Sequence, residues 1–266
     1  MNLNSNFTEP QCKVVKYFLS INTFRNKIIS IFIKYIIQNY SMCELDAYTS
    51  QNNEVNQPIH TFIHIPKCGG SPVEDYFEQH YNDRIFGTTH KWLSTKDNNP
   101  IVIIREPIER FISLYHYWKN GSHGRNSRNQ EFIDKYGKYT ISDFIRTFKT
   151  CIPAINGNYM HELSVGFTWR VHFFKQVYWI PPECFANSIV VLYNNDLNDK
   201  IHQLLEYIGV VDKNIPLEKR NTTRKKEGEE VVISDEDMAW LKEWFKEDFI
   251  LWEAAKHLPQ LFKKVI

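Results

Sequence analysis

Three short runs of apolar residues constrain the fold of this chain more than any other feature. The runs are TFIHI (61–65), IVIIR (101–105) and SIVVLY (188–193), and each is rich in β-branched residues. Short, nearly continuous apolar runs are typical of strands that are covered on both faces of a parallel sheet. A segment with the apolar spacing of a helix follows each run, which favours repeated strand–helix units. We therefore expect an α/β fold with an open, mainly parallel sheet flanked by helices.

Helix signals follow the three runs and recur near the end of the chain. Pro72 and Pro107 each stand at a suitable first helical position, where the missing backbone N–H costs little. Gly209 follows the third helical segment and is a natural C-cap. A last helix is expected to open at Ser234, whose hydroxyl can cap it. These signals predict helices that cover the expected sheet.

The chain, at 266 residues, is long enough for one large domain with a substantial core. A polar, Asn- and Gln-rich stretch ahead of the first strand is typical of a linker. Residues 17–37 are long enough to span a bilayer, but three basic residues interrupt them. We therefore expect an amphipathic helix there, lying on the domain or on a membrane surface, and no signal-peptide pattern is evident. The expected parts are an N-terminal helical segment (1–47), a linker (48–58) and a folded domain (59–266).

Charge and cysteine usage exclude several classes of function. Lys plus Arg number 32 against 31 for Asp plus Glu, and the formal net charge is +1. No global field therefore draws the protein to nucleic acid, and any anion site must be local. The five cysteines are scattered, with no CxxC or Cys/His ligand spacing. We expect no nucleic-acid partner, no metal ion and no disulfide framework.

The stretch HIPKCGGSP (64–72) predicts an anion site at the end of the first strand. A tight turn from a buried parallel strand into a helix points backbone N–H groups at one spot, and the helix N-terminus adds positive potential. Gly69 and Gly70 allow close approach to the backbone, while Lys67 and Ser71 supply further donors. Because Lys67 precedes the glycines, the stretch differs from the GxxxxGK[ST] triphosphate loop. An ordinary strand-to-helix turn is the alternative, since glycine is common in turns.

A second basic position is expected where the next strand ends. In IVIIREPIERFISLY, Arg105 ends the strand and Ser113 lies inside the following helix. Both side chains could then reach a second anionic group beside the first. Arg110 is expected to pair with an acid or a helix end, and His116 to lie on the surface.

The two junctions together resemble a known family. FIHIPKCGGS is similar to the 5′-phosphosulfate loop, and IREPIERFISLY to the 3′-phosphate motif, of the Golgi-type carbohydrate sulfotransferases, in the manner of the heparan sulfate 2-O and 6-O sulfotransferases. Those enzymes use 3′-phosphoadenosine-5′-phosphosulfate (PAPS). The similarity runs from about Phe62 to Tyr117, and more faintly through VLYNNDL (191–197) and NTTRKK to the C-terminus. It implies a P-loop-like sulfotransferase fold for residues 59–266, a glycan acceptor and a Golgi or secretory location.

The resemblance also implies a role for each site residue. Lys67 would stabilise the charge that develops on the leaving phosphate. The family often has threonine where Cys68 and Ser71 stand, so Ser71 keeps a hydroxyl donor and Cys68 does not. The expected PAPS-binding residues are Lys67, Cys68, Gly69, Gly70 and Ser71 at the 5′ end, Arg105 and Ser113 at the 3′-phosphate, and Thr222, Thr223 and Arg224 as second-rank contacts.

A catalytic base is expected between the two motifs. Histidine is the commonest general base near neutral pH, and RIFGTTHKWLS (84–94) resembles a His-containing segment of part of the family. His90 is therefore the candidate that takes the proton of the acceptor hydroxyl, with a surface histidine as the alternative reading. No metal is expected, because Lys67, Arg105 and backbone amides would meet the charge of the donor.

Three other functions remain open from the sequence. A phosphoryl transferase would normally need a lysine after the glycines, which this loop lacks. A non-catalytic nucleotide- or glycan-binding protein would keep the anion site without an acting base. A protein-tyrosine sulfotransferase would use the same donor with a peptide acceptor.

Overall fold

A computed structural model describes the backbone of residues 60–89, 99–120, 134, 136–156, 171–180, 182–211, 213, 215–217 and 231–266. The N-terminal segment (1–47), the linker (48–58), His90 and the Thr222–Arg224 stretch lie outside the described residues. Within the described part, no helix is both long and apolar enough to cross a membrane.

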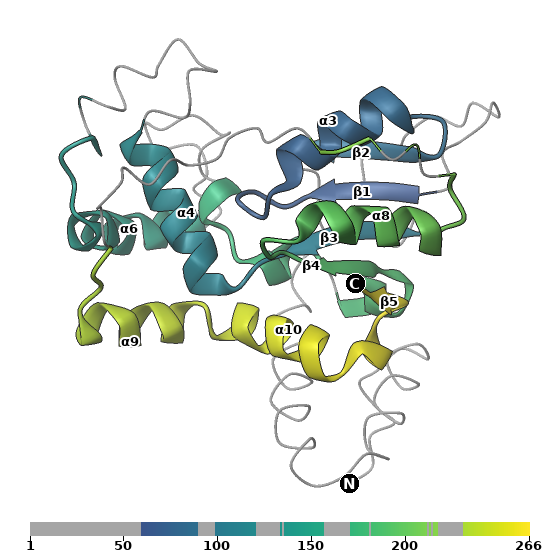
Figure 1. Ribbon diagram of the computed structural model, residues 1–266. Helices are drawn as coiled ribbons and strands as arrows, with labels where there is room; N and C mark the ends of the chain where they lie inside the picture. The colour runs from purple at the N-terminus through teal and green to yellow at the C-terminus, as the bar shows by residue number, and fades with distance from the viewer. Residues whose placement is uncertain are drawn as a thin grey trace, which may run out of the picture.

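The core of the fold is a five-stranded sheet in which every strand pairing is parallel. The strand order is β2-β1-β3-β4-β5 (Figure 1). The three apolar runs become β1, β3 and β4, as expected, and two further strands complete the sheet. The strands are β1 (His60–His64), β2 (Ile85–Thr89), β3 (Pro100–Ile104), β4 (Ile189–Leu192) and β5 (Lys264–Val265). The expectation of an open parallel α/β sheet is confirmed.

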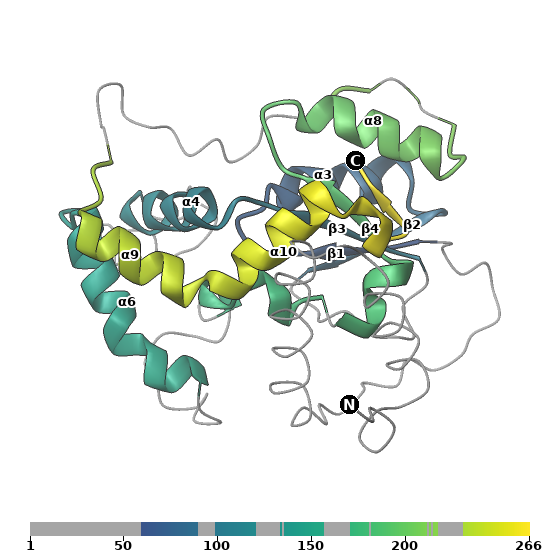
Figure 2. The same ribbon diagram turned by 90° about the horizontal axis from the view of Figure 1, so that it is seen from below.

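Helices bury both faces of the sheet, which explains why its central strands lack polar alternation. All residues of β1 and β3 are buried. Two helices, α3 (Gly70–His80) and α8 (Leu197–Tyr207), lie on one face (Figure 2). On the other face lie two short 3-10 helices, η3 (Gln176–Tyr178) and η4 (Pro182–Asn187). The helix α10 (Lys246–His257) contacts η3 and is thereby tied to that face.

A second core beside the sheet is built largely from aromatic rings. It joins α4 (Pro107–Lys119), α6 (Ile141–Asn156) and α9 (Asp235–Trp244). Phe111 of α4 lies at its centre, with ring centroids 5.5 Å from Phe144 and 5.6 Å from Phe148. Such ring pairs add to the free energy of area burial. This packing fixes α4, the helix that follows Arg105.

The helix ends agree with the sequence in most places. Ser234 caps α9 by accepting from the Asp237 N–H, Pro107 is the first residue of α4, and Gly209 has the left-handed φ of 68°. The expected start at Pro72 is wrong, because α3 begins two residues earlier, at Gly70. Proline is still tolerated there, since first-turn N–H groups have no intrahelical acceptor.

Candidate functional site

The carboxyl ends of β1 and β3 lie side by side where the chain connections diverge. From β1 the chain runs through α3 to β2 on one side, and from β3 it runs to β4 on the other. In open parallel sheets, ligands bind at this kind of switch point, outside the strand ends. The Lys67 loop follows β1 and Arg105 follows β3 directly. The topology therefore brings the two sequence motifs to one place.

The loop after β1 has the backbone of an anion-binding turn. Lys67 and Gly69 both have left-handed φ angles, of 67° and 79°. Left-handed residues that alternate with ordinary ones turn successive N–H groups toward one side. Gly69 is also the N-cap of α3 and has no side chain with which to cap that end. Among the described residues, the first-turn N–H groups of α3 are thus left for another acceptor.

The two glycines are required by close packing as well as by the turn. A Cβ on Gly69 would lie 2.5 Å from Cε2 of Tyr193, the residue that follows β4. A Cβ on Gly70 would overlap the imidazole ring of His64. Any larger residue would push the loop away from the strand ends. The glycine pair therefore sets how near the loop lies to the end of β4.

Lys67 and Arg105 meet at the switch point. Arg105 Nη1 lies 3.5 Å from the backbone oxygen of Lys67, and both side chains are partly buried. An aromatic ring lies against each cation: the Lys67 Nζ is 4.0 Å from the Tyr117 centroid, and the Arg105 guanidinium carbon is 4.4 Å from that of Tyr193. These contacts hold both cations at the carboxyl edge of the sheet.

The positive charge at this point is poorly balanced. Burial, with the charges of Arg105 and Arg110, lowers the pKa of Lys67 to about 7. In the part of the chain that the structure describes, no carboxylate lies within ion-pair distance of Lys67. Among the same described residues, the carboxylate paired with Arg105 is that of the exposed Glu109, at 3.5 Å from its Nε. A bound anion would relieve both the repulsion and the desolvation.

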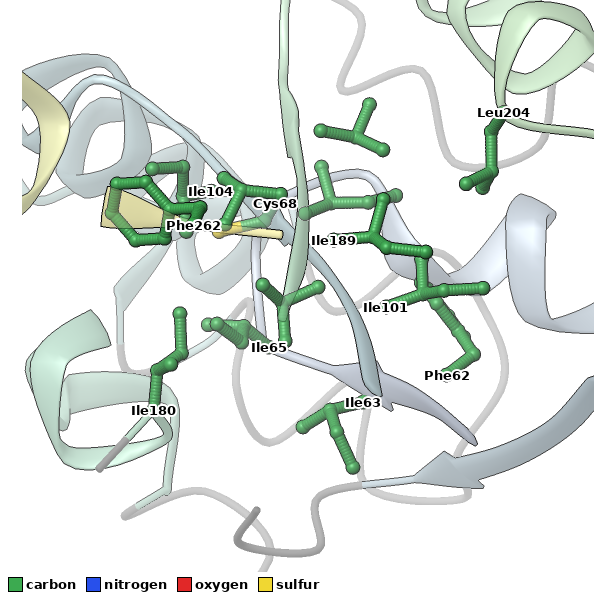
Figure 3. Packing of buried hydrophobic residues seen from close by; sticks show 14 of the residues in the cluster. Phe62, Ile63, Ile65, Cys68, Ile101, Ile104, Ile180, Ile189, Leu204 and Phe262 are labelled. Atoms are coloured by element: carbon green, nitrogen blue, oxygen red, sulfur yellow. The ribbon is translucent and has the colours of Figure 1, made fainter. Parts of the chain in front are cut away.

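Cys68 belongs to the core of the protein. Its side chain is fully buried, beside Ile104 in Figure 3, and its thiol donates to Gln176 Oε1 at 3.2 Å. Burial raises the pKa of the thiol to about 11, so the group stays neutral. The thiol is therefore not turned to a ligand, and the backbone N–H of Cys68 donates to Ile65 O at 3.4 Å, so the assignment of residue 68 to the donor site stays a prediction.

The other expected site residues are placed in part. Ser71 lies in the first turn of α3 and Ser113 in the second turn of α4, and both are partly buried. Both helices start at the edge of the sheet that carries Lys67 and Arg105. β2 ends at Thr89 at the same edge, whereas His90, the next residue in the sequence, lies outside the described residues.

Two expectations from the sequence are wrong. Arg110 is buried and bonds to backbone oxygens: its Nε donates to Pro66 O at 2.9 Å and its Nη2 to His172 O at 3.2 Å. It therefore fixes the loop that carries Lys67 and, among the described residues, forms no ion pair with the acid that was expected. His116 is also buried, not on the surface, because α4 turns that side toward the protein.

Three residues near the site were missed. Tyr193 could have been found, since it ends the third apolar run and so must lie at the carboxyl edge. Tyr117 stands one turn after Ser113 on the same helix, a spacing that places both on one face. Gln176 carries no local signal, because its partners are distant in the sequence.

The chain is thus an open parallel α/β protein whose site lies at the switch point of the sheet, where two cations stand at adjacent strand ends. A family model described as "Sulfotransferase family" matches residues 55–253, so the chain belongs to that family. Membership indicates a transferase that moves a sulfuryl group. Searches of the curated proteins and of the solved structures gave no match. Among the described residues, no group of three or more His, Cys, Asp and Glu could hold a metal ion.

Proposed function

We propose that this protein transfers a sulfuryl group from PAPS to a hydroxyl of a glycan. The contact between the Lys67 loop and Arg105 carries the proposal, because it joins two unbalanced cations at one switch point. PAPS has an anionic group at each end of its ribose, so a ligand of this kind needs two neighbouring cationic positions. The match to the sulfotransferase family supports the same reading.

The residues present fit such a donor. Backbone N–H groups of Gly69 and Gly70, with the N-terminus of α3, would hold the 5′ end beside Lys67 and Ser71. The guanidinium of Arg105 would hold the 3′-phosphate, since its fork matches phosphate oxygens. Its Nε is buried and, among the described residues, has only the ion pair with the exposed Glu109 at 3.5 Å and no hydrogen bond, so an anion could still accept from it. Ser113 would add a hydroxyl, with Thr222, Thr223 and Arg224 as outer contacts.

Lys67 is the residue proposed to act on the reacting atoms. When bound, PAPS supplies the activated sulfuryl group. The protonated Nζ of Lys67 donates to the oxygen on which negative charge develops as the sulfuryl group leaves. This interaction is stronger in the transition state than in the ground state, so it accelerates transfer. His90 would take the proton of the acceptor hydroxyl at a ring nitrogen.

The acceptor and the compartment rest on the resemblance to the carbohydrate sulfotransferases. A glycan hydroxyl is the acceptor that it implies, and a Golgi location belongs to the same proposal. Imaging of the tagged full chain beside a Golgi marker would test the location.

The proposal is tested by supplying labelled PAPS with a panel of oligosaccharides and tyrosine peptides. Transfer to an oligosaccharide is expected, with Lys67→Ala and His90→Ala each abolishing it. Lys242→Ala and His257→Ala are matched controls, because both side chains are exposed on helices and neither belongs to the strand-end loops.

Each other outcome favours a different reading. Full activity in both Lys67→Ala and His90→Ala would end the assigned roles. Binding of 3′-phosphoadenosine-5′-phosphate (PAP) without transfer to any acceptor would identify a non-catalytic binding protein. Transfer to tyrosine peptides alone would identify a protein-tyrosine sulfotransferase.

A further inference from the structure

We propose that Gln176 is a positioning residue that fixes the two halves of the donor site relative to each other; the inference rests on the proposed use of PAPS. Gln176 begins η3 and is fully buried. It stands 71 residues from Arg105 and 108 from Cys68 in the sequence. Its side chain nevertheless contacts both strand-end loops.

The side-chain amide of Gln176 joins the two loops with all of its polar atoms. Its Oε1 accepts from the Arg105 N–H at 2.8 Å and from the Cys68 thiol at 3.2 Å. Its Nε2 donates to the Arg105 carbonyl at 2.8 Å. Arg105 is thus paired through both backbone groups, as it would be by a neighbouring strand. The same amide holds the residue that follows Lys67.

Gln176 is itself held firmly from behind. Its own N–H and that of Val177 donate to the two carboxylate oxygens of Asp248, at 2.9 Å and 3.0 Å. Asp248 is fully buried on α10. Next to it, Lys175 Nζ pairs with Glu247 Oε2 at 2.8 Å. Supporting contacts of this kind are what hold a site to the geometry that its function needs.

The Lys67 loop needs such support. A left-handed φ is unfavourable for a residue with a side chain, and Lys67 adopts it with a φ of 67°. Hydrogen bonds fix the residues on both sides: Arg110 holds the carbonyl of Pro66, and Gln176 holds the thiol of Cys68. Of these two, Gln176 also holds the backbone of Arg105.

A ligand with two charged ends responds to this link differently from a ligand with one. When one end of PAP is bound, the other meets its partner at a high effective concentration, provided that the spacing is fixed. A nucleotide with a single phosphate meets only one half of the site. Loss of the link should therefore weaken the binding of PAP and leave the affinities for 5′-AMP and 3′-AMP nearly unchanged.

Calorimetry with PAP, 5′-AMP and 3′-AMP on the full chain tests this inference. Gln176→Met removes all three hydrogen bonds at nearly constant volume. We expect the preference for PAP over 5′-AMP to fall at least about tenfold, with each single-phosphate Kd changing by less than about twofold. Ser188→Ala is the matched control, because Ser188 is fully buried and donates one hydrogen bond, to Cys184 O, at the opposite end of β4. Ser188→Ala should keep the preference for PAP over 5′-AMP, even if its melting temperature falls as much as that of Gln176→Met.

Substitutions of Cys68 decide the question if Gln176→Met does not fold. Cys68→Ala removes only the hydrogen bond from residue 68 to Gln176 and should lower the preference for PAP over 5′-AMP about threefold. Cys68→Ser retains a hydrogen-bond donor at this position and should retain the preference. An unchanged preference in Gln176→Met, or equal preferences in Cys68→Ala and wild type, would overturn the positioning role. Wild-type protein with no preference for PAP would instead refute the donor assignment itself.

Discussion

Donor binding should weaken as the pH rises above neutrality, because Lys67 loses its proton there. The pKa of Lys67 is lowered from 10.5 to about 7 by burial and by the charges of Arg105 and Arg110. A bound bisphosphate opposes those charges and so returns the pKa toward its ordinary value. Binding therefore needs the protonated lysine, which is present below pH 7 and is depleted in the free protein above it.

The magnitude follows from the fraction of protonated Lys67. From pH 7 to pH 8.5 a group with a pKa of about 7 loses most of its protons, so the Kd of PAP should rise about 15-fold. Phosphate monoesters are already dianions in this range, since their second pKa is about 6. At pH 8, PAP binding should take up about 0.9 proton.

Isothermal calorimetry in buffers of different ionisation enthalpy measures both quantities. Lys67→Arg is the matched control, because a guanidinium stays protonated throughout and should flatten the pH dependence. A Kd that is constant from pH 7 to 8.5 in the wild-type protein would refute the reasoning. The same slope in Lys67→Arg would assign the titration to another group.

Three further predictions concern the same loop. Lys67→Met should raise the free energy of unfolding by about 2 kcal/mol below pH 7, because it removes a desolvated charge. The gain should decline as the pH rises from 7 to 10.5 and disappear above pH 10.5, where Lys67 is neutral in both the folded and the unfolded state; urea titrations that show no gain below pH 7 would contradict it. Gly69→Ala should lower the free energy of unfolding by about 3 kcal/mol, whereas Gly209→Ala should lower it by about 1 kcal/mol. Both positions have a positive φ, but a new Cβ meets Tyr193 only at Gly69, so equal losses in urea would reject the packing argument. Sulfuryl transfer should persist in EDTA, because Lys67 and Arg105 supply the positive charge that the donor needs. A loss of activity in EDTA that a divalent metal restores would disprove this.

The strands and the two basic loops could be predicted because their signals are local. A continuous apolar run indicates a doubly covered strand, and the residue after it must lie at the carboxyl edge of the sheet. Lys67 and Arg105 were found in this way, although nothing local says that Arg105 Nη1 reaches the Lys67 carbonyl.

The missed features depend on contacts that are distant in the sequence. Gln176 bonds across 71 and 108 residues, and no periodicity reports such a partner. Arg110 was expected to pair with an acid or a helix end, yet its Nε donates to Pro66 O in the loop after β1. The start of α3 was placed too late because Pro72 is a good first residue, whereas the left-handed Gly69 sets the actual start.

The features that suit the loop for an anion also destabilise the protein without one. Lys67 has a left-handed backbone, a partly buried ammonium, and two positive neighbours that lower its pKa. Each feature raises the free energy of the folded chain. Hydrogen bonds from Arg110 and to Gln176 hold the arrangement in place, and Asp248 anchors Gln176 from α10. Because an anion between Lys67 and Arg105 would relieve the repulsion, PAP should raise the melting temperature of the wild-type protein more than that of Lys67→Met.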